Sequence, residues 1–185
     1  MGQKQTEIKG CYFKIMGKRT NFKKNERDFY PTPKEAVIPL SKFLNINEEF
    51  CEPCAGDGSL VDHLYSLGFD CVLAFDIEPQ KPSIKKQDVF EINNCVGDLF
   101  ITNPPWTWNI LNPLIEKLSE LKPSWLLLNA DVMHNKRMSE HMKKCVKIVS
   151  IGRISWMQNK QSGFENCAWF LFDQKNINQT IFIGR

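Results

Sequence analysis

The segment Ile101-Thr-Asn-Pro-Pro-Trp106 has the residue types needed to hold a planar amine. Two consecutive prolines fix two φ angles and remove two backbone donors. The turn is therefore rich in acceptors, namely Asn103 Oδ1 and the carbonyls of Asn103 and Pro104. Acceptors beside the flat apolar face of Trp106 suit a planar ring that carries an NH2 group. The alternative role of Trp106, a core tryptophan, is disfavoured by its place after two prolines.

A glycine-containing turn, Glu52-Pro-Cys-Ala-Gly-Asp-Gly58, lies between a predicted strand and a predicted helix. Gly56 and Gly58 allow the backbone to approach a ligand closely. The first amides of the helix, at Ser59 and Leu60, could face an anion. The turn lacks the third glycine of the G-x-G-x-x-G pattern, so on its own it is weak support for nucleotide binding.

Two acidic residues follow the next predicted strands. Asp76 comes 18 residues after Gly58 and can accept both hydroxyls of a ribose, as in nucleotide-binding α/β folds. The alternative for Asp76 is a helix cap or an exposed turn residue. Asp88 could accept from the adenine amine of a cofactor, with a simple turn residue as an equal alternative.

Strands and helices alternate along the chain, which predicts an α/β fold with a doubly wound, mostly parallel sheet. The predicted strands are residues 50–54, 71–75, 84–86, 99–102 and 125–128, and the predicted helices are residues 34–44, 59–67, 109–121 and 136–143. Residues 146–155 and 167–172 lack an intervening helix and predict an antiparallel C-terminal hairpin, with an edge strand at 181–183. Ligands of such sheets bind beyond the carboxyl ends of the strands, where every polar cluster above is predicted to lie.

Composition fits one soluble domain, with 42% hydrophobic and 24% charged residues in 185. Residues 1–24 carry seven basic residues against one acid, a net +6 that leaves −3 for the rest of the +3 total. We therefore expect residues 1–27 to form a basic arm and residues 28–185 to form the single domain. The arm fits phosphate contacts, with a solvated tail as the alternative.

Several classes of protein are disfavoured by the sequence. There is no apolar run of membrane-spanning length and no secretory signal, so we expect a cytoplasmic protein without membrane contact, in the host cytoplasm if phage-encoded. The seven cysteines are irregularly spaced and are expected to be reduced. Cys51 and Cys54 have no second pair at zinc-finger spacing, and we predict no metal site.

The glycine turn, Asp76 and Asn103-Pro-Pro-Trp106, in this order, resemble the class I S-adenosylmethionine-dependent methyltransferases. The last motif resembles those that methylate the exocyclic nitrogen of adenine. The resemblance covers roughly residues 28–172, and the size is similar to the compact enzymes of bacteriophages and mobile elements. It implies a Rossmann-like, seven-stranded methyltransferase sheet. Many DNA methyltransferases carry a sizeable target-recognition region, and little chain is left here to form one.

The resemblance also implies roles for individual residues. Phe29-Tyr-Pro-Thr-Pro33 is similar to an N-terminal cofactor motif, with a helix cap as the alternative role of Thr32. The residues expected to bind S-adenosyl-L-methionine are Tyr30, Thr32, Glu52, Pro53, Ala55, Gly56, Gly58, Asp76, Ile77, Asp88, Val89 and Asn103.

Catalysis is assigned to Asn103, Pro104, Pro105 and Trp106. Asn103 Oδ1 and the Pro104 carbonyl would accept the two N–H groups of the amine and free its lone pair, while Trp106 stacks on the base. No strong base is needed because the sulfonium methyl is already activated. Further residues expected to border the substrate, each with a structural role as the alternative, are Trp108, His134 and Trp156.

The expected function is methylation of the N6 amine of adenine in DNA. Methylation of adenine in RNA or of a protein glutamine amide is an alternative that the turn cannot separate. A non-catalytic binding module is an alternative of another class. The arm favours nucleic acid over protein and does not separate DNA from RNA; of the two, DNA is the expected partner. Specificity would come from the arm, a homodimer partner or an additional specificity subunit.

Overall fold

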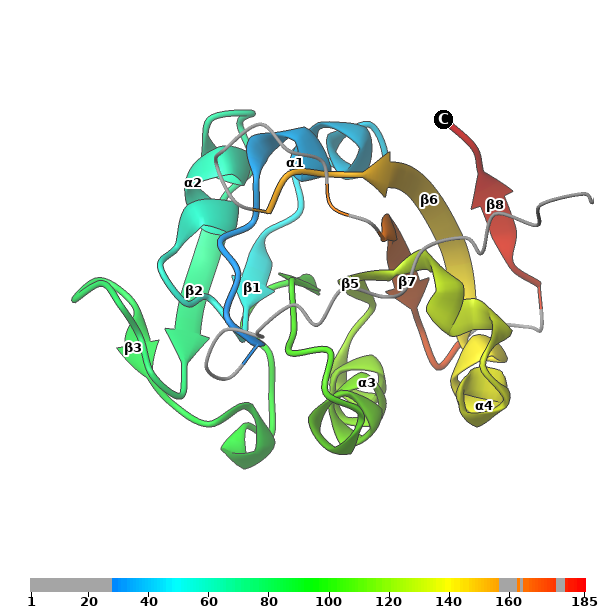
Figure 1. Ribbon diagram of the computed structural model, residues 1–185. Helices are drawn as coiled ribbons and strands as arrows, with labels where there is room; N and C mark the ends of the chain where they lie inside the picture. Colours follow the sequence, from blue (N-terminus) through cyan, green and yellow to red (C-terminus); the bar gives the residue numbers. More distant parts are fainter. Residues whose placement is uncertain (1–27, 157–162, 164, 176–178) are drawn as a thin grey trace, which may run out of the picture.

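The structure, a computed structural model, describes residues 28–156, 163, 165–175 and 179–185 (Figure 1). The predicted basic arm, residues 1–27, lies outside this part of the chain. Within the described residues, no helix is both long enough and apolar enough to cross a membrane.

An eight-stranded sheet with the order β3-β2-β1-β4-β5-β7-β6-β8 organises the fold. The strands are β1 (Phe50–Glu52), β2 (Cys71–Asp76), β3 (Lys85–Lys86), β4 (Leu99–Thr102), β5 (Ser124–Asn129), β6 (Cys145–Arg153), β7 (Asn166–Phe172) and β8 (Ile181–Ile183). β7 is antiparallel to both β5 and β6, and the other pairings are parallel.

The predicted mostly parallel sheet with an antiparallel C-terminal pair is confirmed. β7 inserts between β5 and β6, so the hairpin is not itself the edge of the sheet. Residues 181–183 form that edge as β8, which makes eight strands where the resemblance implied seven.

Helices cover both faces of the sheet (Figure 1). One face carries α1 (Lys34–Ser41) and α2 (Ser59–Tyr65), and the other carries α3 (Trp108–Leu121) and α4 (Ser139–Met142). Short 3-10 turns, η2 (Val89–Glu91), η3 (Ala130–His134) and η4 (Lys136–Met138), follow strand ends or precede α4. The predicted helix at 136–143 is thus divided into η4 and α4, and α1 ends three residues before the predicted position.

The central strands are buried on both faces, because each apolar side chain points alternately into one of two clusters. In β4, Leu99 and Ile101 pack toward α1 and α2, whereas Phe100 packs toward α3. The helix α3 meets the sheet with one apolar stripe, which includes Leu111, Ile115 and Leu118. This packing holds the carboxyl ends of the strands rigidly in register, and those ends carry the polar groups.

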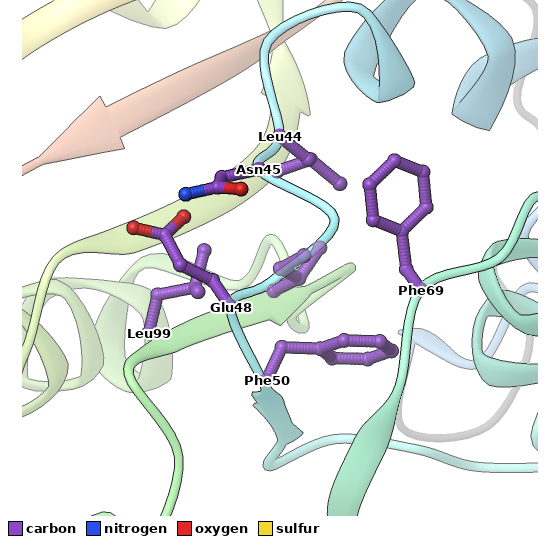
Figure 2. Close-up of a pocket in the computed structure, with 7 residues that line it drawn as sticks. Leu44, Asn45, Glu48, Phe50, Phe69 and Leu99 are labelled. Carbon is purple, nitrogen blue, oxygen red and sulfur yellow. The ribbon is translucent and has the colours of Figure 1, made fainter.

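The opposite, amino edge of the sheet is closed. Figure 2 shows Phe50 and Leu99, the first residues of β1 and β4, beside Leu44 and Phe69. The cavity between them has a volume of about 10 Å³, which holds one water at most. The amino ends of β1 and β4 therefore leave no room for a larger ligand.

Candidate active site

Asn103 is the residue that follows β4, and its side-chain amide is held by the N-terminal segment. Nδ2 donates to the Tyr30 carbonyl and to Thr32 Oγ1, both at 3.2 Å. A carbonyl oxygen only accepts hydrogen bonds, so the NH2 group must face Tyr30 and Oδ1 must face away. Oδ1 accepts no hydrogen bond from the described residues. The structure thus presents an oriented acceptor at the carboxyl edge.

The two prolines keep this turn free of donors. Pro104 is buried and Pro105 is half-buried, and neither has a backbone N–H. No described residue donates to the Pro104 carbonyl. The acceptor-rich character expected from the sequence is therefore retained in the folded turn.

Trp106 is anchored through its indole nitrogen. Nε1 donates to the Leu127 carbonyl of β5 at 3.0 Å. β4 ends at Thr102, which pairs with Leu126 of β5. The indole therefore binds the carbonyl of the next β5 residue, which has no pairing partner in β4. The ring is half-buried and packs against both apolar clusters. Trp106 thus has a structural role. Its stacking on a base stays a prediction.

Two further aromatic residues lie beside Trp106. Trp156 meets it edge-on, with ring centroids 5.7 Å apart and an interplanar angle of 86°. Tyr30 in turn lies 6.1 Å from Trp156. The structure therefore brings Tyr30, Trp106 and Trp156 together around the Asn103 turn.

The glycine turn adopts the conformation that its residues allow. Gly56 and Gly58 have φ angles of +51° and +79°, in the left-handed region. A Cβ on Gly56 would lie 2.5 Å from Phe29 Cε2, so a side chain there would displace the N-terminal segment. Pro53 and Ala55 are buried in the same turn.

Asp76 fastens this turn to the end of β2. Its Oδ2 accepts from the Gly56 N–H at 2.8 Å, and its Oδ1 accepts from the Glu78 N–H at 2.7 Å. A carboxylate has about four acceptor positions, so each oxygen can still accept from a ligand. Asp76 can therefore hold the turn and bind two hydroxyls at once.

Glu52 is a buried acid with an unpaired oxygen. The side chain is 1% exposed, and burial raises the pKa of its carboxyl well above the usual range. The Thr102 hydroxyl and the Asn103 backbone amide lie close enough to oppose this rise. Even so, Glu52 Oε2, Thr102 Oγ1 and Gln87 Oε1 are buried without hydrogen-bond partners among the described residues. Such orphaned acceptors are costly unless a ligand supplies donors.

Asp88 caps the 3-10 turn η2 by accepting from the Phe90 N–H at 2.9 Å. Asp88 thus has the turn role that the sequence analysis gave as its alternative. Its second carboxylate oxygen remains available to a ligand. Val89 is buried, whereas Ile77 is 53% exposed and Phe90 is 42% exposed. Phe90 and Gln87 were missed by sequence reasoning, because nothing in the local pattern indicated η2.

The other two predicted substrate residues, Trp108 and His134, lie in α3 and η3. Trp108 begins α3 and packs against Arg137 and His141. His134 ends η3 and is exposed. Within the described residues, no three His, Cys, Asp or Glu side chains gather as metal ligands do.

Comparisons with known proteins were made by sequence and by structure. No protein-family model matches this sequence, and no curated protein sequence matches it. Its fold resembles that of a candidate RNA methyltransferase from Pyrococcus horikoshii, with 18% identity, a TM-score of 0.61, and coverage of 78% of this chain and 86% of that one.

Two other solved structures share the fold. A candidate class I S-adenosylmethionine-dependent methyltransferase from Listeria monocytogenes has 11% identity and a TM-score of 0.57, over 83% of this chain and 65% of that one. The modification subunit of a candidate type I restriction enzyme from Vibrio vulnificus has 12% identity and a TM-score of 0.56, over 84% of this chain and 47% of that one. At these identities the likeness establishes the Rossmann-like methyltransferase fold.

The buried Glu52 predicts a specific pH dependence of stability. Its pKa is raised in the folded chain, so the folded state keeps a proton that the unfolded state releases. The free energy of unfolding should therefore fall as the pH rises from the ordinary glutamate pKa through the raised one. In Glu52→Gln this decrease should be lost, and thermal unfolding between about pH 5 and pH 8 should show a flatter profile and a higher midpoint at pH 8. Exposed Glu120→Gln is the control and should follow the wild type; a Glu52→Gln profile as steep as wild type would contradict the assignment.

Proposed function

We propose that this protein transfers a methyl group from S-adenosyl-L-methionine to the N6 amine of adenine in DNA. The observation that carries the proposal is the fixed orientation of the Asn103 amide, whose NH2 group is bound by Tyr30 and Thr32. That orientation frees Oδ1 as an acceptor, and the Pro104 carbonyl, one residue later in the chain, would be the second acceptor. An amine with two N–H groups is the ligand that two adjacent acceptors suit.

The residues of the glycine turn and the neighbouring strand ends fit the cofactor. Glu52 would accept from the ammonium group of the cofactor, and Asp76 would accept from its ribose hydroxyls. Gln87 and Asp88 offer acceptors to its adenine amine, and exposed Ile77 and Phe90 offer apolar contacts to the ring. An ammonium group would pair with the orphaned Oε2 of Glu52 and displace the proton that burial otherwise keeps on this carboxyl. When bound, this cofactor supplies a methyl group on a positively charged sulfur, which is already activated for transfer.

The chain itself would then act mainly by orientation. Asn103 Oδ1 and the Pro104 carbonyl accept the two N–H groups, which draws the nitrogen toward a tetrahedral geometry and frees its lone pair. No side chain needs to remove a proton first, and the proton can leave to water after transfer. Orientation of this kind can contribute ~7–11 kcal/mol. Stacking on Trp106 would contribute ~1–3 kcal/mol toward holding an extruded base.

The choice of a nucleic acid as the substrate rests on the basic N-terminal residues and on the structural neighbours. The basic residues of the segment 1–24 favour a nucleic acid over a protein amide. The structural neighbours include both a candidate RNA methyltransferase and the modification subunit of a candidate type I restriction enzyme. The second neighbour is by its name one subunit of a larger enzyme, which favours assembly with other subunits here as well. Adenine in RNA is therefore the second candidate substrate.

The proposed activity can be tested by nucleoside mass spectrometry after incubation with cofactor and unmethylated DNA. We expect N6-methyladenine from the wild type and a loss of at least ~100-fold in kcat for Asn103→Ala, because one of the two acceptors is removed. Matched DNA and RNA oligonucleotides separate the two substrates. Methylation of a different atom, or full turnover by Asn103→Ala, would refute the proposed mechanism. Isothermal calorimetry without any heat of cofactor binding would favour the non-catalytic module.

Thr32 is expected to act as a positioning residue through Asn103. Thr32→Val removes the hydroxyl that accepts from Asn103 Nδ2 and keeps the shape of the side chain. We expect kcat to fall by ~10- to 100-fold, because misplacement of a catalytic group by about 1 Å can cost ~100-fold. Thr32→Ser keeps the hydroxyl and should restore most of the rate. An equal loss in both variants would assign Thr32 to packing instead.

A further inference from the structure

A second polar and aromatic cluster lies beside the Asn103 turn and is built on Trp108. The Arg137 guanidinium carbon lies 4.3 Å from the centre of the Trp108 ring, a distance typical of cation–π contacts. Arg137 is otherwise exposed. Because Trp108 comes two residues after Trp106, the contact places a cation close to the proposed target site.

The base of this cluster is rigid. The His141 ring contacts Trp108 edge-on, with centroids 6.1 Å apart, and His141 Nε2 lies 2.8 Å from Asn112 Oδ1. His141 is only 6% exposed, and burial lowers the pKa of its imidazole, which is therefore neutral at pH 7. Neutral His141 links α3 to α4 and supports the tryptophan that carries Arg137.

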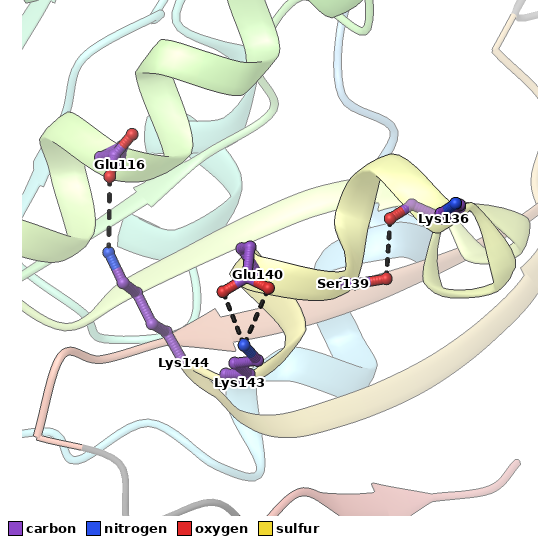
Figure 3. Close-up of polar contacts among 6 residues, drawn as sticks. All are labelled: Glu116, Lys136, Ser139, Glu140, Lys143 and Lys144. Atoms are coloured by element: carbon purple, nitrogen blue, oxygen red, sulfur yellow. Dashed lines mark hydrogen bonds and ion pairs between the residues drawn. The ribbon is translucent and has the colours of Figure 1, made fainter.

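The positive charges of this region differ in how they are compensated (Figure 3). Lys143 Nζ lies 2.7 Å from Glu140 Oε2, and Lys144 Nζ lies 3.8 Å from Glu116 Oε1. Lys136 and Arg137, both in η4 and both exposed, form no ion pair with an acid among the residues described. The uncompensated charge is thus concentrated in η4, next to Trp108.

We infer that η4 and Trp108 form a contact surface for the phosphate backbone of the nucleic acid, next to the target adenine. This inference rests on the proposed function and names a binding surface for its substrate. A guanidinium binds phosphate oxygens through two parallel N–H bonds, and contact with an aromatic ring limits the freedom it must lose on binding. Lys136 adds a point charge to the same turn. Neither contact reads the base sequence.

The test uses the full chain and a fluorescein-labelled mixed-sequence oligonucleotide of single-stranded DNA, with affinity measured by fluorescence anisotropy at several salt concentrations. We expect Arg137→Ala to bind about 3- to 10-fold more weakly at low salt. Its slope of log K against log salt should be shallower by ~0.7, the value for one lost phosphate contact. Arg137→Lys keeps the charge and should be intermediate, and Lys136→Ala should lower the slope independently.

The matched control is Lys42→Ala, which removes one exposed lysine directly after α1, on the opposite face of the sheet from α4. It should bind as the wild type does. In the methylation assay, Arg137→Ala should raise KM for DNA and leave kcat and the cofactor affinity nearly unchanged.

Three results would overturn the inference. One is a wild-type affinity and salt slope in both Arg137→Ala and Lys136→Ala. Another is an equal effect in Lys42→Ala. The third is tighter binding of a polyglutamate peptide than of the oligonucleotide, together with a loss of affinity in Arg137→Ala for the peptide alone. That result would make this a protein-docking surface. If the wild type binds the oligonucleotide but does not methylate it, the proposed function is refuted and the binding surface is not. The two outcomes can be distinguished because the anisotropy assay does not depend on turnover.

Discussion

The hydrogen bonds of the Asn103 amide are the constraint on which the candidate site depends. An asparagine side chain has an NH2 group that donates hydrogen bonds and an oxygen that accepts them. To act as an acceptor for a ligand, the side chain must have its NH2 group turned away from that ligand. Tyr30 and Thr32 achieve this from 73 and 71 residues earlier in the chain. The same N-terminal segment places Phe29 against Gly56. Residues 29–32 therefore contact both the turn proposed for the cofactor and the turn proposed for the amine.

The segment is itself fastened at its start. The Thr107 hydroxyl donates to the Asp28 carboxylate, and Thr107 lies four residues after Asn103. Asp28 has a φ of +55°, an uncommon value for a residue other than glycine. Such conformations persist where surrounding contacts enforce them. The N-terminal segment is thus held at both ends of the turn, which explains how a mobile amide can be kept in one orientation at an exposed edge.

The carboxyl edge also contains groups that weaken the fold. Glu52 is buried with an orphaned oxygen, and Thr102 and Gln87 have orphaned oxygens as well. Apolar replacements would serve a structural core better, because an unpaired buried acceptor costs ~1–3 kcal/mol. Local conflicts of this kind are expected where a site is prepared for a ligand. A donor-rich cofactor would satisfy these acceptors, and its binding would then stabilise the fold.

Much of this arrangement could be read from the sequence, because its signals are local. The apolar runs of β4 and β5, the glycines of the turn and the prolines after Asn103 act over a few residues. The position of β7 between β5 and β6 could not be predicted, since strand order depends on long-range pairing. The structural contacts of Trp106 and Trp108 could not be predicted either. The Trp106 indole bonds a strand carbonyl that is distant in sequence, and Trp108 packs on a 3-10 turn that has no periodic pattern.

The two aromatic clusters suggest how this domain could contact a nucleic acid substrate. Tyr30, Trp106 and Trp156 lie around Asn103, and Trp108 with Arg137 lies just beyond it. Stacking on aromatic rings tolerates any base, and phosphate contacts carry no sequence information. If both clusters bind nucleic acid, they give affinity and orientation with little discrimination between sites. Base-edge contacts would then have to come from elsewhere in the chain or from a partner subunit, because these clusters supply none.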